Sequence, residues 1–236
     1  MLKFATKFAP EADAFNTATE AGFQYAELWL GAKTLARRKV VASLASQYSL
    51  CYGLHFPNRS ELDDQDLQSA ASLYRDLGCT AMVIHKPMLR RYGARLMTYD
   101  RSIRLAVENH RLTWDEFNRW ADENAWLTLD VEHFWKLTLR DAPLEELLGK
   151  LDKLLTSHGG KIIHVHLPGY LPGEAEHRPL SHAGEAALQI LSTFAAHGFE
   201  GLVVSEADLP YQNVSEMRRD VLWFDHWLKV YGDGRR

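Results

Sequence analysis

The segment KIIHVHLPGY, residues 161–170, places two histidines at alternate positions inside an apolar run. Side chains alternate between the two faces of a strand, so His164 and His166 share one face and Ile163 and Val165 share the other. One face therefore suits packing against helices. The other carries ionisable rings, which indicates a polar site on the opposite side of the same sheet.

The rest of the chain repeats this unit, because short apolar runs alternate with amphipathic stretches such as residues 62–78 and 144–160. Strands that alternate with helices predict a parallel sheet with helical crossovers. Eight such repeats in 236 residues favour a closed (β/α)8 TIM barrel, formed by residues 1–236 as a single domain. The eight apolar runs begin at Leu2, Tyr25, Cys51, Cys79, Ile103, Trp126, Lys161 and Gly201.

Local signals place several helix ends. Thr113 followed by Glu116 predicts a capping box at the start of a helix. Residues 88–102 must supply a whole helix between two strands, although Gly93 interrupts the pattern. Other glycines are predicted to end helices, at the position just past the last turn: Gly78, Gly159 and Gly198.

Composition narrows the class of protein. Hydrophobic residues make up 46% of the chain, and 27 Lys and Arg against 31 Asp and Glu give a net charge of −4, so nucleic acid is an unexpected partner. The cysteines, Cys51 and Cys79, have no metal-like spacing and suit a reducing compartment. The N-terminal residues lack the apolar region of a signal peptide, and no run reaches membrane-spanning length. We therefore expect a cytoplasmic protein without a membrane partner.

The face assigned to the barrel interior ends, in six of the eight units, with an ionisable side chain. The carboxyl ends of barrel strands meet at one rim, where active sites of this fold are built. We therefore expect six ionisable side chains to converge there, with His164 one layer deeper as a packing or supporting residue. The six rim residues are His55, His85, Glu108, Asp130, His166 and Glu206.

Three carboxylates at one rim would raise one another's pKa values unless a cation lay between them. Glu108, Asp130, His166 and Glu206 together offer three oxygen donors and one imidazole, a set that suits Mn²⁺, Zn²⁺ or Co²⁺. Any one of these residues alone is more simply explained as a helix cap or a core residue. The same residue class at the same strand position in several units is what favours a divalent metal site.

Seven motifs resemble those of the xylose isomerase-like TIM-barrel superfamily and span residues 50–207 in its order. The superfamily contains sugar isomerases and epimerases, inosose dehydratase-like enzymes and apurinic endonucleases of the endonuclease IV type. The motifs are LHFP, VIHKP, AVENH, LTLDVEHF, HVHLPGY, HRPLSHAGE and VVSEA.

For the isomerase and epimerase branch, the resemblance implies one divalent ion held by Glu108, Asp130, His166 and Glu206. It also implies that Glu108 and Glu206 act as acid and base in proton transfer. The substrate would be a small sugar, polyol or hydroxy-carbonyl compound, and the ion would stabilise an enediolate.

The endonuclease IV branch implies a zinc-dependent phosphodiesterase with up to three zinc ions. This chain departs from that branch because Ala175 stands where an aspartate is expected, and Ser181 and Ala183 replace glycines. A catalytically degenerate barrel that only binds a ligand is the third hypothesis. The residues that would supply additional metal or substrate contacts are His55, His85, His133 and His177.

Aromatic side chains near the rim could line a carbohydrate pocket. Trp29 and Trp135 are the candidates, although tryptophans near strand ends also pack in cores. No stripe on the predicted helix faces indicates an oligomeric state.

Overall fold

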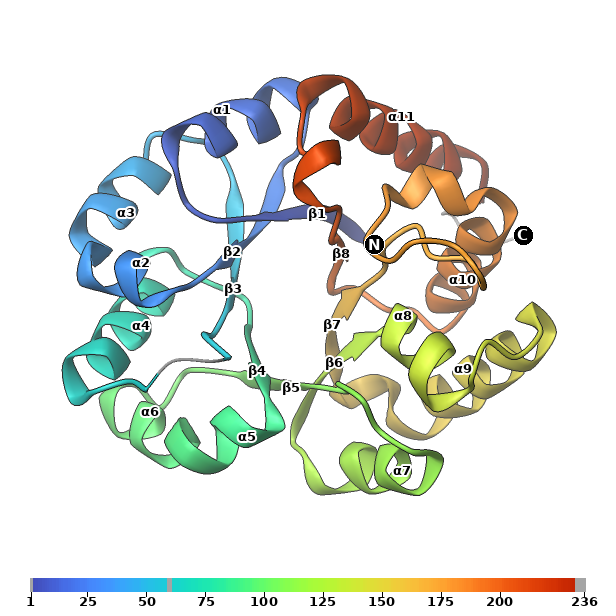
Figure 1. Cartoon of the computed structure of the whole chain (residues 1–236), viewed down its shortest axis with the longest axis horizontal. Helices are drawn as coiled ribbons and strands as arrows, with labels where there is room; N and C mark the ends of the chain where they lie inside the picture. Colours follow the sequence, from blue (N-terminus) through green and yellow to red (C-terminus); the bar gives the residue numbers. More distant parts are fainter. Residues whose placement is uncertain (1, 59–60, 232–236) are drawn as a thin grey trace.

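In the described part of the chain, residues 2–58 and 61–231, the computed structural model contains eight parallel strands. They are hydrogen-bonded in sequence order and close into a barrel where β8 pairs with β1, so the predicted TIM barrel is confirmed (Figure 1). The strands are β1 (Lys3–Phe8), β2 (Tyr25–Trp29), β3 (Cys51–His55), β4 (Met82–His85), β5 (Leu105–Glu108), β6 (Trp126–Asp130), β7 (Ile162–His166) and β8 (Leu202–Ser205).

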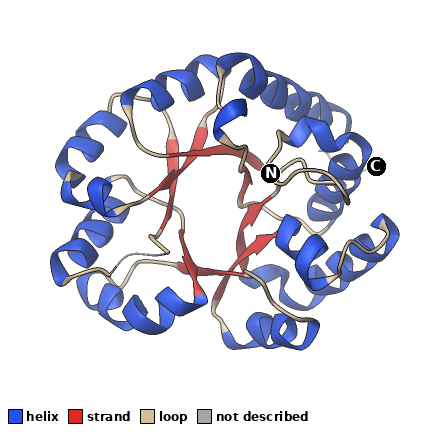
Figure 2. Ribbon diagram, viewed as in Figure 1, coloured by secondary structure: helices blue, strands red, loops and turns tan. Residues whose placement is uncertain are grey.

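Helices form a ring around the strands, as Figure 2 shows. No helix within the described ranges is long and apolar enough to cross a membrane. The α-helices are α1 (Ala12–Ala21), α2 (Ala32–Ala36), α3 (Arg38–Ala45), α4 (Asp64–Asp76), α5 (Lys86–Met88), α6 (Ala94–Tyr99), α7 (Trp114–Glu123), α8 (Val131–His133), α9 (Leu144–His158), α10 (Gly184–Ala196) and α11 (Val214–Tyr231). The other helical turns are the π-helical η1 (Leu89–Gly93) and η2 (Phe134–Thr138) and the 3₁₀ turns η3 (Gly159–Lys161), η4 (Leu180–Ala183) and η5 (Leu209–Tyr211).

The predicted helix signals have different outcomes. The capping box is confirmed, because Thr113 N donates to Glu116 Oε2 over 2.9 Å and Glu116 N donates to Thr113 Oγ1. Gly78 and Gly198 follow helix C-caps with φ of +60° and +67°, the left-handed conformation that favours glycine. The helix α9 also ends directly before Gly159, as predicted, but the φ of this glycine is −51° and the chain continues into the η3 turn before β7.

The unit after β4 is helical. Residues 86–99 form α5, η1 and α6 in succession, so the predicted helix is confirmed and Gly93 lies inside its π turn. A Cβ atom at Gly93 would lie 2.8 Å from Leu89 Cδ1. The missing side chain therefore lets the turn pack closely and does not end the helix.

Buried apolar side chains in the described residues form two separate clusters. The larger one joins the outer face of the sheet to the helices. The smaller one consists of Ala5, Leu202 and Val204, with Tyr25 packed against it. These side chains belong to the face that the alternation rule assigns to the barrel interior. The interior is therefore apolar toward the start of the strands, and polar side chains follow toward their carboxyl ends.

Adding a methyl group is expected to change the free energy of unfolding in opposite directions at two glycines. A Cβ atom at Gly169, in the loop after β7, would lie 1.8 Å from the carbonyl oxygen of Pro179, whereas one at Gly149, in α9, would meet nothing within 4 Å. We expect Gly169→Ala to lower the free energy of unfolding by about 1–3 kcal/mol through overpacking. Gly149→Ala should raise it by about 0.5–1 kcal/mol by restricting the unfolded chain. Urea unfolding measures both, and equal changes would contradict this account of the loop.

Candidate metal centre at the barrel mouth

The rim residues expected from the sequence all lie at the carboxyl ends of strands. Glu206 directly follows β8, and the other five end their strands. Neighbouring strands bring some of them level, because Asp130 is in register with His166 and His85 is in register with Glu108. The strands run parallel in one closed sheet (Figure 1), so their carboxyl ends, and the residues that end them, lie at the same end of the barrel.

The side chains of the predicted four-residue metal set surround one atom, Nδ1 of His166. Glu206 Oε2 lies 3.1 Å from this nitrogen, Asp130 Oδ2 lies 3.8 Å from it, and Glu108 Oε2 lies 4.0 Å from it. His166 and Asp130 are fully buried, and Glu108 is 4% exposed. Four strands therefore contribute donor atoms to one small volume that is nearly closed to solvent.

Several donor atoms in this volume are buried and make no hydrogen bond within the described structure. They include His166 Nδ1, Asp130 Oδ2 and His133 Nδ1. Buried polar atoms without a hydrogen bond are uncommon in folded proteins, and the neighbours of these atoms are charged groups, as where His133 Nδ1 lies 3.1 Å from Asp130 Oδ2. Here they are the imidazole and carboxylate atoms that a divalent transition metal accepts as ligands. The residues present therefore fit a divalent cation at this position.

A second group of donors shares Glu108 with the first. His85 Nε2 lies 3.0 Å from Glu108 Oε2, and His55 Nε2 lies 3.2 Å from the same oxygen. The other nitrogen of His55 lies 3.1 Å from the carbonyl oxygen of Phe56, which fixes the ring. His110 is not among the residues predicted for the site. Its ring stacks on that of His85, with the centroids 5.0 Å apart. Glu108 could thus bridge two cations.

The charges at the mouth are strongly coupled. Burial alone would raise the pKa of Glu206, but His166 and Lys7 hold it well below its usual range. Burial would lower the pKa of His166, yet the carboxylates of Glu206 and Glu27 raise it well above its usual value. Burial also opposes protonation of His133, but Asp130 and Glu108 raise its pKa to about 9. In the absence of a cation, these two rings therefore carry the balancing positive charge.

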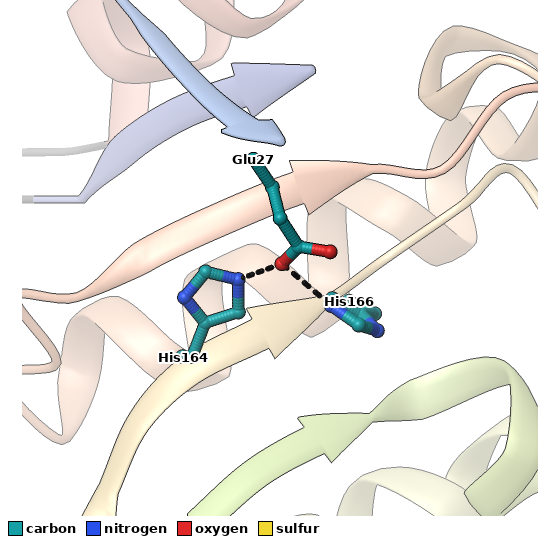
Figure 3. Close-up of side chains that lie close together, drawn as sticks. All are labelled: Glu27, His164 and His166. Atoms are coloured by element: carbon teal, nitrogen blue, oxygen red, sulfur yellow. Dashed lines mark hydrogen bonds and ion pairs between the residues drawn. The ribbon is translucent and has the colours of Figure 1, made fainter. Parts of the chain in front are cut away.

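Two charged residues of this interior, Lys7 and Glu27, were not predicted. Glu27 is fully buried in β2 and accepts hydrogen bonds from Nε2 of His164 (2.5 Å) and Nε2 of His166 (3.0 Å), as Figure 3 shows. Lys7, in β1, is in register with Glu27, lies 3.1 Å from its Oε1 and contacts Glu206. The sequence does contain a signal for both residues, because each is a charged residue on the inward face of one of the first two apolar runs.

The remaining candidate residues, His177, Trp29 and Trp135, differ in their contacts and in their exposure to solvent. His177 is grouped with Glu132 and Glu176, and its backbone N–H donates to Glu132 Oε2 over 3.1 Å. Trp29, the last residue of β2, is 51% exposed, whereas Trp135 is 3% exposed. The indole N–H of Trp135 donates to the carbonyl oxygen of Ala142 over 2.7 Å, so this side chain packs behind the rim. Of the two tryptophans, Trp29 is the one open to a bound molecule.

No family profile matches the sequence, and a search of curated proteins finds no match. Solved structures do resemble the fold. A D-tagatose 3-epimerase-like protein is 16% identical over 99% of this chain and 100% of its own, with a TM-score of 0.67. Endonuclease IV from Thermus thermophilus is 17% identical over 96% and 99%, with a TM-score of 0.63.

A D-allulose 3-epimerase from Methylomonas sp., solved in complex with D-allulose, is 15% identical over 95% of this chain and 96% of its own, with a TM-score of 0.62. At these identities the likeness concerns the fold, and it agrees with the resemblance predicted from the motifs. The chain therefore shares its fold with structures of sugar epimerases and of endonuclease IV.

Proposed function

We propose that this chain is a metal-dependent isomerase or epimerase of a small carbohydrate-like substrate. The observation that carries the proposal is the convergence of Glu108, Asp130 and Glu206 on Nδ1 of His166. Mn²⁺, Zn²⁺ or Co²⁺ suits these donors. Epimerase structures with the same fold, including the one that holds D-allulose, support the choice of substrate class.

When bound, the ion would polarise a carbonyl and a neighbouring hydroxyl of the substrate. The C–H group of the carbon that bears this hydroxyl would then lose its proton more easily. Glu206 is the proposed base, because Lys7 and His166 keep it in the ionised form that accepts a proton. Glu108, from β5, is the proposed partner acid, and His133 Nδ1 lies 3.4 Å from its Oε1 as a proton source. Carboxylates from two different strands suit removal of a proton at one face of the substrate carbon and its return at the other.

Trp29 is proposed to line the carbohydrate pocket. It is exposed at the end of β2 and in register with His55, one of the six rim residues. A flat apolar surface next to polar donors suits a sugar, whose C–H groups pack on aromatic rings while its hydroxyls bind polar groups. Trp135, the other candidate pocket residue, is 3% exposed and so offers little surface to a bound molecule.

A panel assay tests the proposal. The protein is loaded with Mn²⁺, Zn²⁺ or Co²⁺ and incubated in D₂O with ketoses, inososes and, separately, abasic DNA. Exchange of a substrate C–H proton for deuterium, followed by NMR, detects proton transfer before any product is identified. We expect exchange with at least one of the sugars or polyols. Cleavage of abasic DNA without any exchange would contradict the proposal.

A zinc-dependent phosphodiesterase is the second candidate, and the group formed by His55, His85 and Glu108 favours it. The two functions predict different metal contents. The isomerase predicts one tightly held ion per chain at the Asp130 and His166 position, whereas the phosphodiesterase predicts two or three. Elemental analysis of protein dialysed against a slight excess of Zn²⁺ gives the number. His85→Asn should leave the count at one if the isomerase proposal is right, and a fall from two to one would favour the alternative.

A further inference from the structure

We propose that Glu27 is a positioning residue that makes Nδ1 of His166, and not Nε2, the atom that faces the cation. The inference rests on the proposed cation site but concerns Glu27 and His164, which the proton-transfer step does not use. It also explains why β7 carries two histidines on one face, since both rings point toward the Glu27 carboxylate (Figure 3).

The first step is the hydrogen bonding of His166. Its Nε2 lies 3.0 Å from Glu27 Oε2, within hydrogen-bonding distance of an acceptor that is fully buried. A ring nitrogen that donates its proton to a carboxylate has no lone pair left for a metal, so the other nitrogen must serve as the ligand. That other nitrogen, Nδ1, is the buried atom without a hydrogen bond around which the predicted ligands gather.

The second step is the charge of Glu27. An isolated carboxylate would be costly to bury, but Lys7 Nζ lies 3.1 Å from Glu27 Oε1. The ammonium group of Lys7 thus balances the carboxylate charge at one oxygen, and the other oxygen is placed to accept from both rings. Lys7 also contacts Glu206. The lysine therefore links the positioning carboxylate to a proposed ligand of the cation.

The third step is the placement of His164. Its Nε2 donates to Glu27 Oε2 over 2.5 Å, which limits rotation of the carboxylate. Gly53, in register with Glu27 on β3, leaves space for this ring, because a Cβ atom there would lie 3.1 Å from His164 Cε1. His164 is fully buried, so the protein packs around its ring on all sides.

Glu27, His164 and His166 also lie close enough together to be considered as a cation site of their own. The contacts oppose that interpretation. One carboxylate oxygen is already at direct hydrogen-bonding distance from both rings, and the ammonium group of Lys7 lies 3.1 Å from the other oxygen. A second cation would share the carboxylate with the ammonium group. The arrangement is instead that of a carboxylate supporting a ligating histidine.

The test measures Zn²⁺ binding and needs no substrate. Glu27→Gln keeps the shape of the side chain but removes its charge, and it should weaken Zn²⁺ affinity by about 10–100-fold in a competition titration with a chelating indicator. In wild-type protein labelled with [¹⁵N]histidine and loaded with Zn²⁺, NMR should show His166 with a metal-bound Nδ1 and a protonated Nε2. The NMR measurement needs no variant, so it remains decisive if Glu27→Gln folds poorly.

Tyr52→Phe provides the control. It removes a buried hydrogen bond from Tyr52 to the carbonyl oxygen of Ala45, between β3 and the helices, and should lower stability without changing Zn²⁺ affinity. Zn²⁺ bound to Nε2 of His166, or a Glu27→Gln affinity within about twofold of wild type, would overturn the role of Glu27 alone. Wild-type protein that binds no Zn²⁺ would overturn the cation site and this inference together.

Discussion

Replacing Glu206 with glutamine is expected to reduce proton transfer by about 10²–10⁴-fold at saturating metal, the range that a positioned general base contributes. Glutamine has nearly the same shape as glutamate, but its amide cannot accept the substrate proton. The contacts of Glu206 with Lys7 and His166 maintain the ionised form in the wild type, and the variant loses that charge. Deuterium exchange into the best substrate of the panel measures the effect.

Two controls separate the loss of a base from the loss of a ligand. Metal content and thermal stability of Glu206→Gln should be measured at the same free metal concentration, so that the rate refers to loaded, folded protein. Glu20→Gln, an exposed change in the last turn of α1, provides a matched substitution near the start of β2, at the end of the barrel opposite the rim. Exchange at the wild-type rate in fully loaded Glu206→Gln would remove this residue from the role of base.

Much of the site could be predicted because its positions follow from local patterns. The period of two assigns one face of each strand to the barrel interior, and the end of the strand then fixes which side chain reaches the rim. Glu108, Asp130 and His166 were placed in this way, although they come from different strands. Barrel closure brings such residues together without any direct sequence signal between them.

The support beneath the site was not predictable in the same way. Glu27 was visible as a charge inside an apolar run, but its partner His164 lies 137 positions further along the chain. Nothing in either segment specifies that the two will meet. Trp135 illustrates the same limit, because its burial depends on Ala142 and on the ring of Tyr170 in a different loop. Residues whose role depends on such distant partners require the structure.

Removing the bound cation is expected to lower the melting temperature by about 5–10 °C. A cation at about 100 times its Kd contributes about 2.7 kcal/mol to the free energy of unfolding, and in a chain of this length each kcal/mol shifts the midpoint by about 2–4 °C. Without the ion, Glu108, Asp130 and Glu206 face one another around Nδ1 of His166. Differential scanning calorimetry after EDTA treatment, and again after Mn²⁺ or Zn²⁺ is restored, measures the change.

Asp130→Asn separates specific binding from general effects of chelation. The asparagine side chain would keep an oxygen for the hydrogen bond from His133 N, which Asp130 Oδ1 accepts over 2.7 Å, but it would lack the second carboxylate oxygen that lies beside His166. We expect the cation-free variant to melt below the cation-free wild type, since His133 loses the carboxylate that lies 3.1 Å from its Nδ1, and to gain little from added metal. A degenerate barrel without a metal predicts no response in either protein, and an equal gain in both would place the ion away from Asp130.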